Sequence, residues 1–329
     1  VFHAKLGSQY ERVERLEKLA GQIAPAFGAN VQEAKRAARL SKADLTTGVV
    51  GEFPELQGLM GGYYALHDGE SDNVVIAISE HYGPVGRNPA SENVVSNAVA
   101  VADKWDTISK FFSVGEKPTG SGDPFAIRRA ALGIIRILLE RKHRISLSSL
   151  PGYSDEILSF FVERLKVALR ESNQVPQDLI DATFSLGNDS DLVRVTNRGD
   201  ALQKFLKTED GANLLAGYKR AANILKAEEK KDNKTFTSEV LEGHLAEPAE
   251  KALFAALANA RAAIKPVLEK EDFAAAMQHM AALRPPVDAF FDGVKVNADD
   301  KAVRENRLNL LASLRATLHQ VADFSRIEG

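Results

Sequence analysis

Apolar residues recur with helical spacing along most of this 329-residue sequence, whereas alternating, strand-like runs are scarce. Alanine, leucine, glutamate, lysine and arginine, which all favour helices, are plentiful. The twelve prolines fall mostly between the periodic segments, where they do not interrupt a helix. The sequence therefore predicts an all-α fold.

The length predicts two or three domains, because a domain usually takes roughly 100–200 residues. A dense turn cluster at 118–124 is expected to end the first domain. The charged run 226–234 lacks apolar residues and indicates a solvated hinge or loop near the second boundary. We expect a helical domain over 1–120, a helical connecting body over 121–235 and a C-terminal helical bundle over 236–329.

Composition excludes several classes of protein. The absence of cysteine excludes disulfides, thiol catalysis and cysteine-ligated zinc, and a cytoplasmic setting is expected. No charge-free apolar run approaches the length of about 18 residues that a spanning helix needs, so no membrane partner is expected. The sequence begins at Val1 without the pattern of a signal peptide, and we expect it to start inside a larger protein. The net charge of -3 gives no preference for nucleic acid, so any such surface must be a local patch.

Capping patterns place the first helices. Residues 8–11 have the form of a capping box, and residues 30–33 repeat the pattern. The second helix is expected to run to about residue 49 and to carry Asp44 near its C-terminal end. Asp123 before a proline is expected to be the N-cap of a later helix. Further helices are expected at about 91–115, 124–142, 155–171, 176–186, 189–206, 210–227 and 299–321, with two alanine-rich helices between 248 and 283.

Three acidic or imidazole side chains could in principle converge on a divalent ion. His3, Asp44 and Asp103 lie on three separate helical segments, in an order that a helical metallohydrolase could use. One nitrogen and two carboxylates are a poor set for holding a transition metal that activates water. The other histidines form no zinc motif, and no nucleophile elbow or phosphate loop is present. We expect no catalytic residue and no bound metal in this chain.

The order of these residues resembles that of the HD superfamily, in which a His, a His-Asp pair and a distal Asp hold a metal. The last motif is matched at Asp103, but the pair reads Ala43-Asp44 and lacks its histidine. A metal-dependent phosphohydrolase of the HD type stays open as the alternative function. The other interpretation is a relict pocket in which these residues cap helices or pair with Arg and Lys.

A basic strip is the clearest candidate for binding nucleic acid. Residues 126–144 hold six Arg or Lys residues against the single acid Glu140, a local charge of +5. Arg129 and Arg136 are seven residues apart, so they project from one helix face and could meet phosphates. The alternative, weighted equally, is a solvated face that pairs with acids of neighbouring helices.

The last helix carries three arginines with different predicted roles. Arg307 lies beside the apolar stripe, so it is expected to be buried and structural, with Asp288 or Asp292 as its carboxylate partner. Arg304 and Arg315 lie eleven residues apart, point in nearly the same direction and are expected to face RNA.

Several short segments of the sequence are distinctive. They are Lys42-Ala43-Asp44-Leu45, Gly51-Glu52-Phe53-Pro54-Glu55-Leu56-Gln57-Gly58, Glu80-His81-Tyr82, Pro118-Thr119-Gly120-Ser121, Asp123-Pro124-Phe125-Ala126, Arg128-Arg129-Ala130-Ala131, 284–292 and Arg304-Glu305-Asn306-Arg307-Leu308. Together they resemble the β subunit of the bacterial two-subunit glycyl-tRNA synthetase. The last two segments are similar to the helical DALR anticodon-binding domain of class I arginyl-type synthetases.

The resemblance implies that the chain is the C-terminal half of such a subunit, with an HD-like domain, a connecting body and an anticodon-binding domain. It implies that glycine activation, with ATP and Mg, belongs to the α subunit, so no cofactor is expected in this chain. It implies glycine tRNA and the α subunit as partners, in an α2β2 assembly.

The leading hypothesis is a non-catalytic, tRNA-binding portion of glycine–tRNA ligase that contributes by positioning the tRNA. An HD-type phosphohydrolase and a helical scaffold that only joins proteins are the rivals. The residues expected to contact tRNA are Arg128, Arg129, Arg136, Arg141, Lys142, Arg304 and Arg315.

Overall fold

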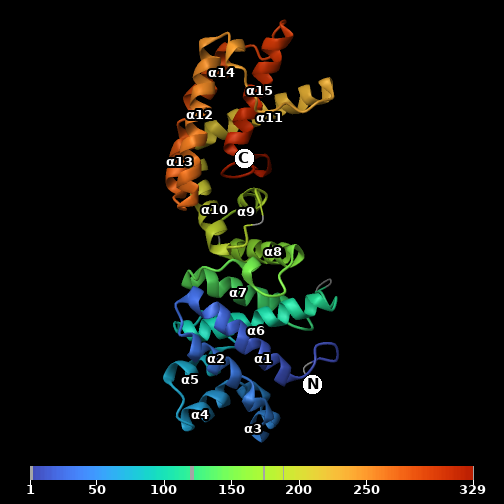
Figure 1. Ribbon diagram of the computed structural model, residues 1–329, viewed down its shortest axis with the longest axis vertical. Coiled ribbons are helices and arrows are strands. Elements are labelled where there is room, and N and C mark those ends of the chain that lie inside the picture. Colours follow the sequence, from blue (N-terminus) through green and yellow to red (C-terminus); the bar gives the residue numbers. More distant parts are fainter. Residues whose placement is uncertain (1–2, 119–121, 173–174, 188, 329) are drawn as a thin grey trace. The chain divides into compact units, whose positions relative to one another are not determined.

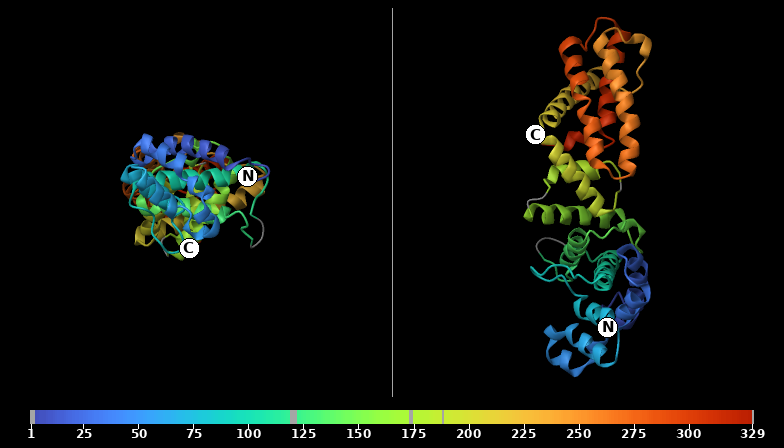
Figure 2. Two further views of the ribbon diagram at one scale, coloured as in Figure 1. Left: turned by 90° about the horizontal axis from the view of Figure 1, so that it is seen from below. Right: turned by 90° about the vertical axis from the view of Figure 1, so that its left-hand side faces the viewer.

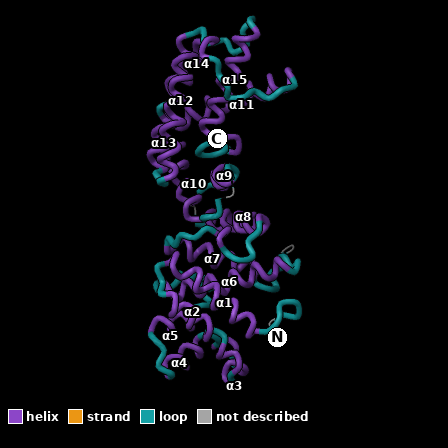
Figure 3. The backbone as a smooth tube through the Cα atoms, in the orientation of Figure 1, coloured by secondary structure: helices purple, strands orange, loops and turns teal. Residues whose placement is uncertain are grey.

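The computed structural model describes residues 3–118, 122–172, 175–187 and 189–328. These residues form helices joined by loops and turns, with no strand beyond an isolated bridge between His3 and Gly7 (Figure 3). The predicted all-α fold is confirmed. None of the helices in these ranges is both long and apolar enough to span a bilayer.

The helices divide into two compact units, each described by itself. Unit 1 comprises Val1–Ser172 with Ser190–Val193, and unit 2 comprises Asn173–Asp189 with Arg194–Gly329. The three-domain division expected from the sequence stays a prediction.

Unit 1 is built around one long, buried helix. Fifteen of the twenty residues of α6 are buried, because α1, α5 and α7 pack against it (Figure 1). A helix that is apolar almost all round needs such neighbours on every side. The helices of this unit are α1 Gln9–Ile23, α2 Val31–Leu40, α3 Gly48–Glu52, α4 Leu59–His67, α5 Asp72–Glu80, α6 Val94–Ser113, α7 Ile127–Arg141 and α8 Asp155–Glu171.

The second predicted helix is shorter than expected. The capping box of α1 forms between Ser8 and Glu11 as predicted, and Asn30 caps α2. However, α2 ends at Leu40, and the Ser41 hydroxyl donates to a carbonyl of its last turn. Serine side chains compete with the helical hydrogen-bond ladder in this way. Asp44 therefore lies in a separate 3-10 turn and not at the end of a longer helix.

The start of α7 also differs from the prediction. The helix begins at Ile127, three residues after Pro124, because Ala126 takes a left-handed conformation with φ 56°. Asp123 still caps the helix, since its carboxylate accepts the backbone N–H groups of Arg128 (3.1 Å) and Arg129 (3.3 Å). Residues 119–121 of the predicted turn cluster lie outside the described residues.

Unit 2 is a bundle in which long helices run alongside one another (Figure 2). The charged run 226–234 was wrongly predicted to be a loop, because α11 continues to Asp232. Glu228 in this run is buried and bound to Arg304, so the segment is not a solvated loop. The helices are α9 Gln177–Phe184, α10 Leu192–Leu206, α11 Glu209–Asp232, α12 Pro248–Glu269, α13 Phe273–Ala281, α14 Arg284–Gly293 and α15 Lys301–Leu318.

Candidate functional site

The three residues of the predicted HD-like pocket have separate partners. The His3 ring packs against Phe111 and Phe125, with ring centroids 5.2 and 5.5 Å away. Asp44 is buried, and its Oδ2 accepts the backbone N–H groups of Gly58 (2.6 Å) and Gly61 (3.1 Å). Among the described residues, no three His, Asp or Glu side chains form a group that could hold a metal ion.

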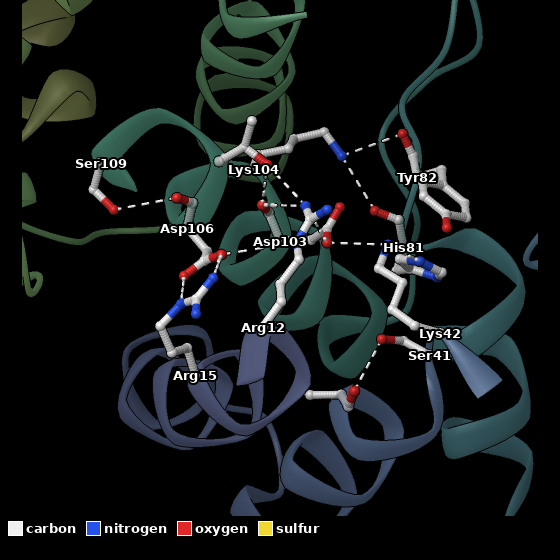
Figure 4. Close-up of polar contacts among 12 residues, drawn as sticks. Arg12, Arg15, Ser41, Lys42, His81, Tyr82, Asp103, Lys104, Asp106 and Ser109 are labelled. Carbon is white, nitrogen blue, oxygen red and sulfur yellow. Dashed lines mark hydrogen bonds and ion pairs between the residues drawn. The ribbon is translucent and has the colours of Figure 1, made fainter. Parts of the chain in front are cut away.

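Asp103 is instead the centre of a buried cluster of charged side chains, drawn in Figure 4. Its Oδ1 accepts from Arg12 of α1 at 3.0 Å and lies 3.0 Å from the Lys42 ammonium, which follows α2. Lys42 Nζ in turn lies 2.7 Å from Nε2 of His81, at the end of α5. Lys104 completes what we call the Asp103 cluster: Arg12, Lys42, His81, Asp103 and Lys104.

Hydrogen bonds define the protonation of His81. Its Nδ1 lies 2.7 Å from the carbonyl oxygen of Ile78, so Nδ1 carries the proton and donates it to that oxygen. Nε2 is then an acceptor for the Lys42 ammonium. Burial and the charge of Lys42 lower the pKa of His81 well below its ordinary value. His81 is therefore a neutral, fully engaged imidazole in the folded protein.

The charges of the cluster depend on one another. Burial opposes ionisation of Asp103, but the charges of Arg12 and Lys42 outweigh it and hold the pKa of this carboxyl well below its usual range. Burial lowers the pKa of Lys42 to about 8, although Asp103 opposes the shift. Lys104 donates to the backbone carbonyls of His81 (3.2 Å), Tyr82 (3.2 Å) and Gly83 (2.5 Å), and burial lowers its pKa to about 8 as well.

These residues do not fit the metal that the HD resemblance would imply. The Lys42 ammonium lies between Nε2 of His81 and Oδ1 of Asp103, so both of these potential metal ligands are already engaged by a cation. Oδ1 of Asp44 is buried and has no hydrogen-bond partner among the described residues, but it could supply only one ligand. A catalytic site usually needs three protein ligands. The alternative of an HD-type phosphohydrolase is not favoured.

The neutral state of buried His81 predicts an acid-sensitive fold. Below about pH 6.5 the imidazole of the unfolded chain takes up a proton that the folded protein does not bind. The unfolded state then binds more protons, so stability must fall as the pH falls. We expect the slope of unfolding free energy against pH, measured with urea between about pH 6 and 5, to be smaller in His81→Gln by up to about 1.4 kcal/mol per pH unit. Equal slopes in the two proteins would contradict a neutral, buried His81.

The sequence singled out Asp103, and the relict-pocket interpretation expected Arg and Lys partners, but Arg12, Lys42 and Lys104 were not identified as those partners. The available signal was their setting, because Lys104 lies within the almost wholly buried α6. A cation in such a position needs a partner.

The basic residues on α7 divide into anchored and exposed members. Arg136 donates to the carbonyls of Gly86 (2.8 Å) and Asn88 and pairs with Glu140, while Arg141 donates to the Ala90 carbonyl. These contacts hold the loop before α6 against α7. The side chain of Arg129 is 74% exposed and only loosely paired with Asp123 at 3.4 Å, and Lys142 is exposed at the end of the helix.

We call Arg128, Arg129, Arg136, Arg141 and Lys142 the α7 basic strip. The apolar residues Ile127, Ala131, Ile134 and Leu138 are buried on the other side of the helix, as the periodicity predicted. Arg128 donates to the Gly122 carbonyl at 2.8 Å. Contact of the strip with RNA stays a prediction, for which Arg129 and Lys142 are the accessible members.

The structure separates the three arginines of α15. Arg307 is buried as predicted, but its carboxylate partner is Glu250 at the start of α12, and not Asp288 or Asp292. Arg307 also donates to the Lys295 carbonyl at 2.8 Å. The partner was missed because α12 is distant in sequence, and only the folded bundle brings its first turn to α15.

Arg304 and Arg315 both pair with acids of α11. Arg304 is largely enclosed, since Glu228 and Asp232 (2.7 Å) both accept from its guanidinium. Arg315 lies 3.2 Å from Glu229 and remains partly exposed. It also lines an open pocket of about 440 Å³ together with Gln320, whose Oε1 is buried and has no partner among the described residues. The pocket is lined by Phe236, Ser238, Ala312, Arg315, Ala316, His319 and Gln320.

Two family models match different parts of the chain. The model described as glycyl-tRNA synthetase beta subunit matches residues 1–185. The model described as DALR anticodon binding domain matches residues 214–327, which cover the helices from α11 to α15. The second match therefore begins inside α11, before the boundary at 236 that the sequence suggested.

Curated relatives agree with the first model. The chain is 55% identical to the glycine–tRNA ligase beta subunit of Phenylobacterium zucineum, and this match covers the whole chain but 49% of the relative. The corresponding subunits of Rhodospirillum centenum and Cereibacter sphaeroides are 52% and 51% identical over the whole chain and 48% and 50% of their own lengths. The chain thus spans about half the length of the curated relatives it matches. By the extent of these matches, the chain belongs to the glycyl-tRNA synthetase β-subunit family.

Proposed function

We propose that this chain is the tRNA-binding portion of a glycine–tRNA ligase β subunit, and that it positions glycine tRNA for ATP-dependent charging on an α subunit. The observation that carries the proposal is the match of an anticodon-binding domain to the bundle α11–α15. The same bundle holds the open pocket beside Arg315.

The proposal assigns bond formation to the α subunit. The strongest candidate for a reaction centre in this chain, the Asp103 cluster, has its imidazole and carboxylate engaged by Lys42 and Arg12. Holding a tRNA end in the correct orientation lowers the barrier of a reaction without chemistry from the positioning chain. ATP and Mg are then cofactors of the α subunit, in an α2β2 assembly that works in the cytoplasm.

Two surfaces are proposed to contact the tRNA. Arg129 and Lys142 of the α7 basic strip would meet phosphates, because both are exposed cations. The Arg315 pocket would accept an unstacked base, since it places a guanidinium donor in a hollow that the Phe236 ring also lines. Arg304, Arg136 and Arg141 would support these surfaces through the contacts that they make within the protein.

Substitutions on the two surfaces should change tRNA binding in different ways. We expect Arg129→Glu with Lys142→Glu to weaken binding of every tRNA about tenfold or more and to reduce the salt slope by about 1 per lost phosphate contact. Arg315→Ala should instead weaken binding of glycine tRNA more than that of other tRNAs, because base contacts carry sequence information and phosphate contacts do not. Fluorescence anisotropy with labelled tRNA at several salt concentrations measures both effects.

The matched control is Lys18→Glu with Lys204→Glu, which makes the same change in net charge at exposed lysines on other helices. This control should bind tRNA nearly as the parent does. If the control loses as much affinity as the α7 variant, the binding follows net charge alone and the assigned surface is wrong.

A further inference from the structure

Helix α4 is apolar on faces that the rest of the chain does not cover. Its sequence, Leu59–His67, contains no Asp, Glu, Lys or Arg. A helix of this kind is normally buried all round. Yet Leu59, Tyr63 and Leu66 have 47%, 59% and 55% of their surface exposed. They recur at i, i+4 and i+7, so they lie in one row, which we call the α4 apolar stripe.

The buried face of α4 is already used for packing inside unit 1. Gly61 and Gly62 let the helix lie close to α5, and a Cβ atom at Gly62 would come within 1.9 Å of the Ser79 hydroxyl. α4 and α5 lie side by side in Figure 1. The stripe projects from a different face, and Val49 and Phe53 add exposed apolar side chains just before it. A row of exposed apolar side chains on one helix face is typical of an interaction site.

Charge indicates the kind of partner. Between Lys42 and Arg87 the sequence contains seven Asp or Glu residues and no Lys or Arg. Asp44 is buried and Glu70 pairs with Arg36 of α2, so the exposed acids are Glu52, Glu55, Asp68, Asp72 and Glu80. This segment includes the whole of α3, α4 and α5. A phosphate backbone would be repelled by this surface, and a second copy would bring two acidic rims together. The complementary partner is a protein surface with an apolar centre and a basic rim.

We propose that the α4 apolar stripe is the docking surface for the half of the β subunit that this chain does not span. The curated relatives are about twice as long as the chain. In the relatives that half is covalently joined to the part that this chain matches, so its effective concentration at the stripe would far exceed that of a separate protein. The occupant's identity rests on the family membership, whereas the exposed stripe and its acidic surroundings do not depend on tRNA binding.

Hydrogen exchange tests the proposal in the full-length β subunit, in which these 329 residues are joined to the half that the relatives carry and this chain lacks. The amides of α3 and α4 should exchange about tenfold more slowly there than in the 329-residue chain alone, because docking suppresses local opening. In the full-length subunit, Tyr63→Lys with Leu66→Lys should restore the fast exchange, since docking would bury the new ammonium groups against the apolar centre of the partner surface.

The matched control is Val85→Lys with Leu241→Lys, at positions that are 62% and 60% exposed and lie off the stripe. It should leave the protection of α4 intact, and circular dichroism should show the same melting temperature for both variants in the 329-residue chain. Equal exchange in the short and full-length chains would overturn the proposal. Protection that appears only after an α subunit or a tRNA is added would overturn it too, because the occupant would then be another molecule.

Discussion

Replacing Arg307 by alanine is expected to lower the free energy of unfolding of the chain by about 3–5 kcal/mol. The change leaves the carboxyl group of Glu250 fully buried and without its guanidinium partner. It also removes the donor to the Lys295 carbonyl at 2.8 Å. Glu250 meanwhile accepts the backbone N–H of Glu247 at 2.6 Å, so the unpaired charge lies at the first turn of α12. Urea unfolding followed by circular dichroism measures the loss.

An arginine in an exposed ion pair is the matched control. Arg326 pairs with Asp323 at 3.2 Å, and its side chain is 54% exposed. Arg326→Ala should cost less than about 1 kcal/mol, because exposed pairs contribute little. Replacing both Arg307 and Glu250 with apolar residues should cost less than removing Arg307 alone. An Arg307→Ala protein that unfolds at the same urea concentration as the parent would contradict the buried pair.

Replacing Asp103 by alanine is expected to cost a similar amount, about 3–5 kcal/mol, because Arg12 and Lys42 then lose their shared buried counter-charge. Trp105 is the single tryptophan of the chain and is buried two residues further along α6. Its fluorescence therefore reports on unfolding around the Asp103 cluster itself.

Two further variants make the Asp103 result specific. Asp68→Ala removes an exposed acid from unit 1 and should change the fluorescence transition by less than about 0.5 kcal/mol. Lys42→Met introduced beside Asp103→Ala should recover part of the loss, because one uncompensated buried cation is removed. No recovery, together with a loss no larger than that of Asp68→Ala, would show that Asp103 does not hold the two cations together.

Local signals in the sequence predicted the helices well. The Ser8 capping box fixed the start of α1, and the apolar period of α6 and α15 placed both helices within a few residues. One helix boundary was predicted wrongly where the local sequence pattern did not show a contact with a distant residue. The charged run 226–234 was expected to be solvated, but α11 continues to Asp232, and Glu228 within the run is bound to Arg304 of α15.

The candidate site could be predicted only in part, because its partners come from distant segments. The position of Arg307 beside the apolar stripe of its helix indicated that it is buried. Its partner Glu250 lies 57 residues away in the sequence, so no local pattern could identify it. Asp103 was recognised from its motif, but its partners are distant in sequence: Arg12 lies on α1, and Lys42 follows α2. On α7, periodicity identified the outward face, whereas the loop carbonyls that anchor Arg136 are visible only in the fold.

The central claim is the proposed function: this chain binds tRNA, and the aminoacylation reaction takes place on another subunit. The most direct test is the affinity of the 329-residue chain for a glycine tRNA transcript at about 50 and 200 mM salt, measured after metal removal. The account predicts binding at the lower salt concentration that weakens at least about tenfold at the higher one, as release of counterions from several phosphates requires. Absence of binding at the lower salt concentration, or an affinity that does not change with salt, would contradict it.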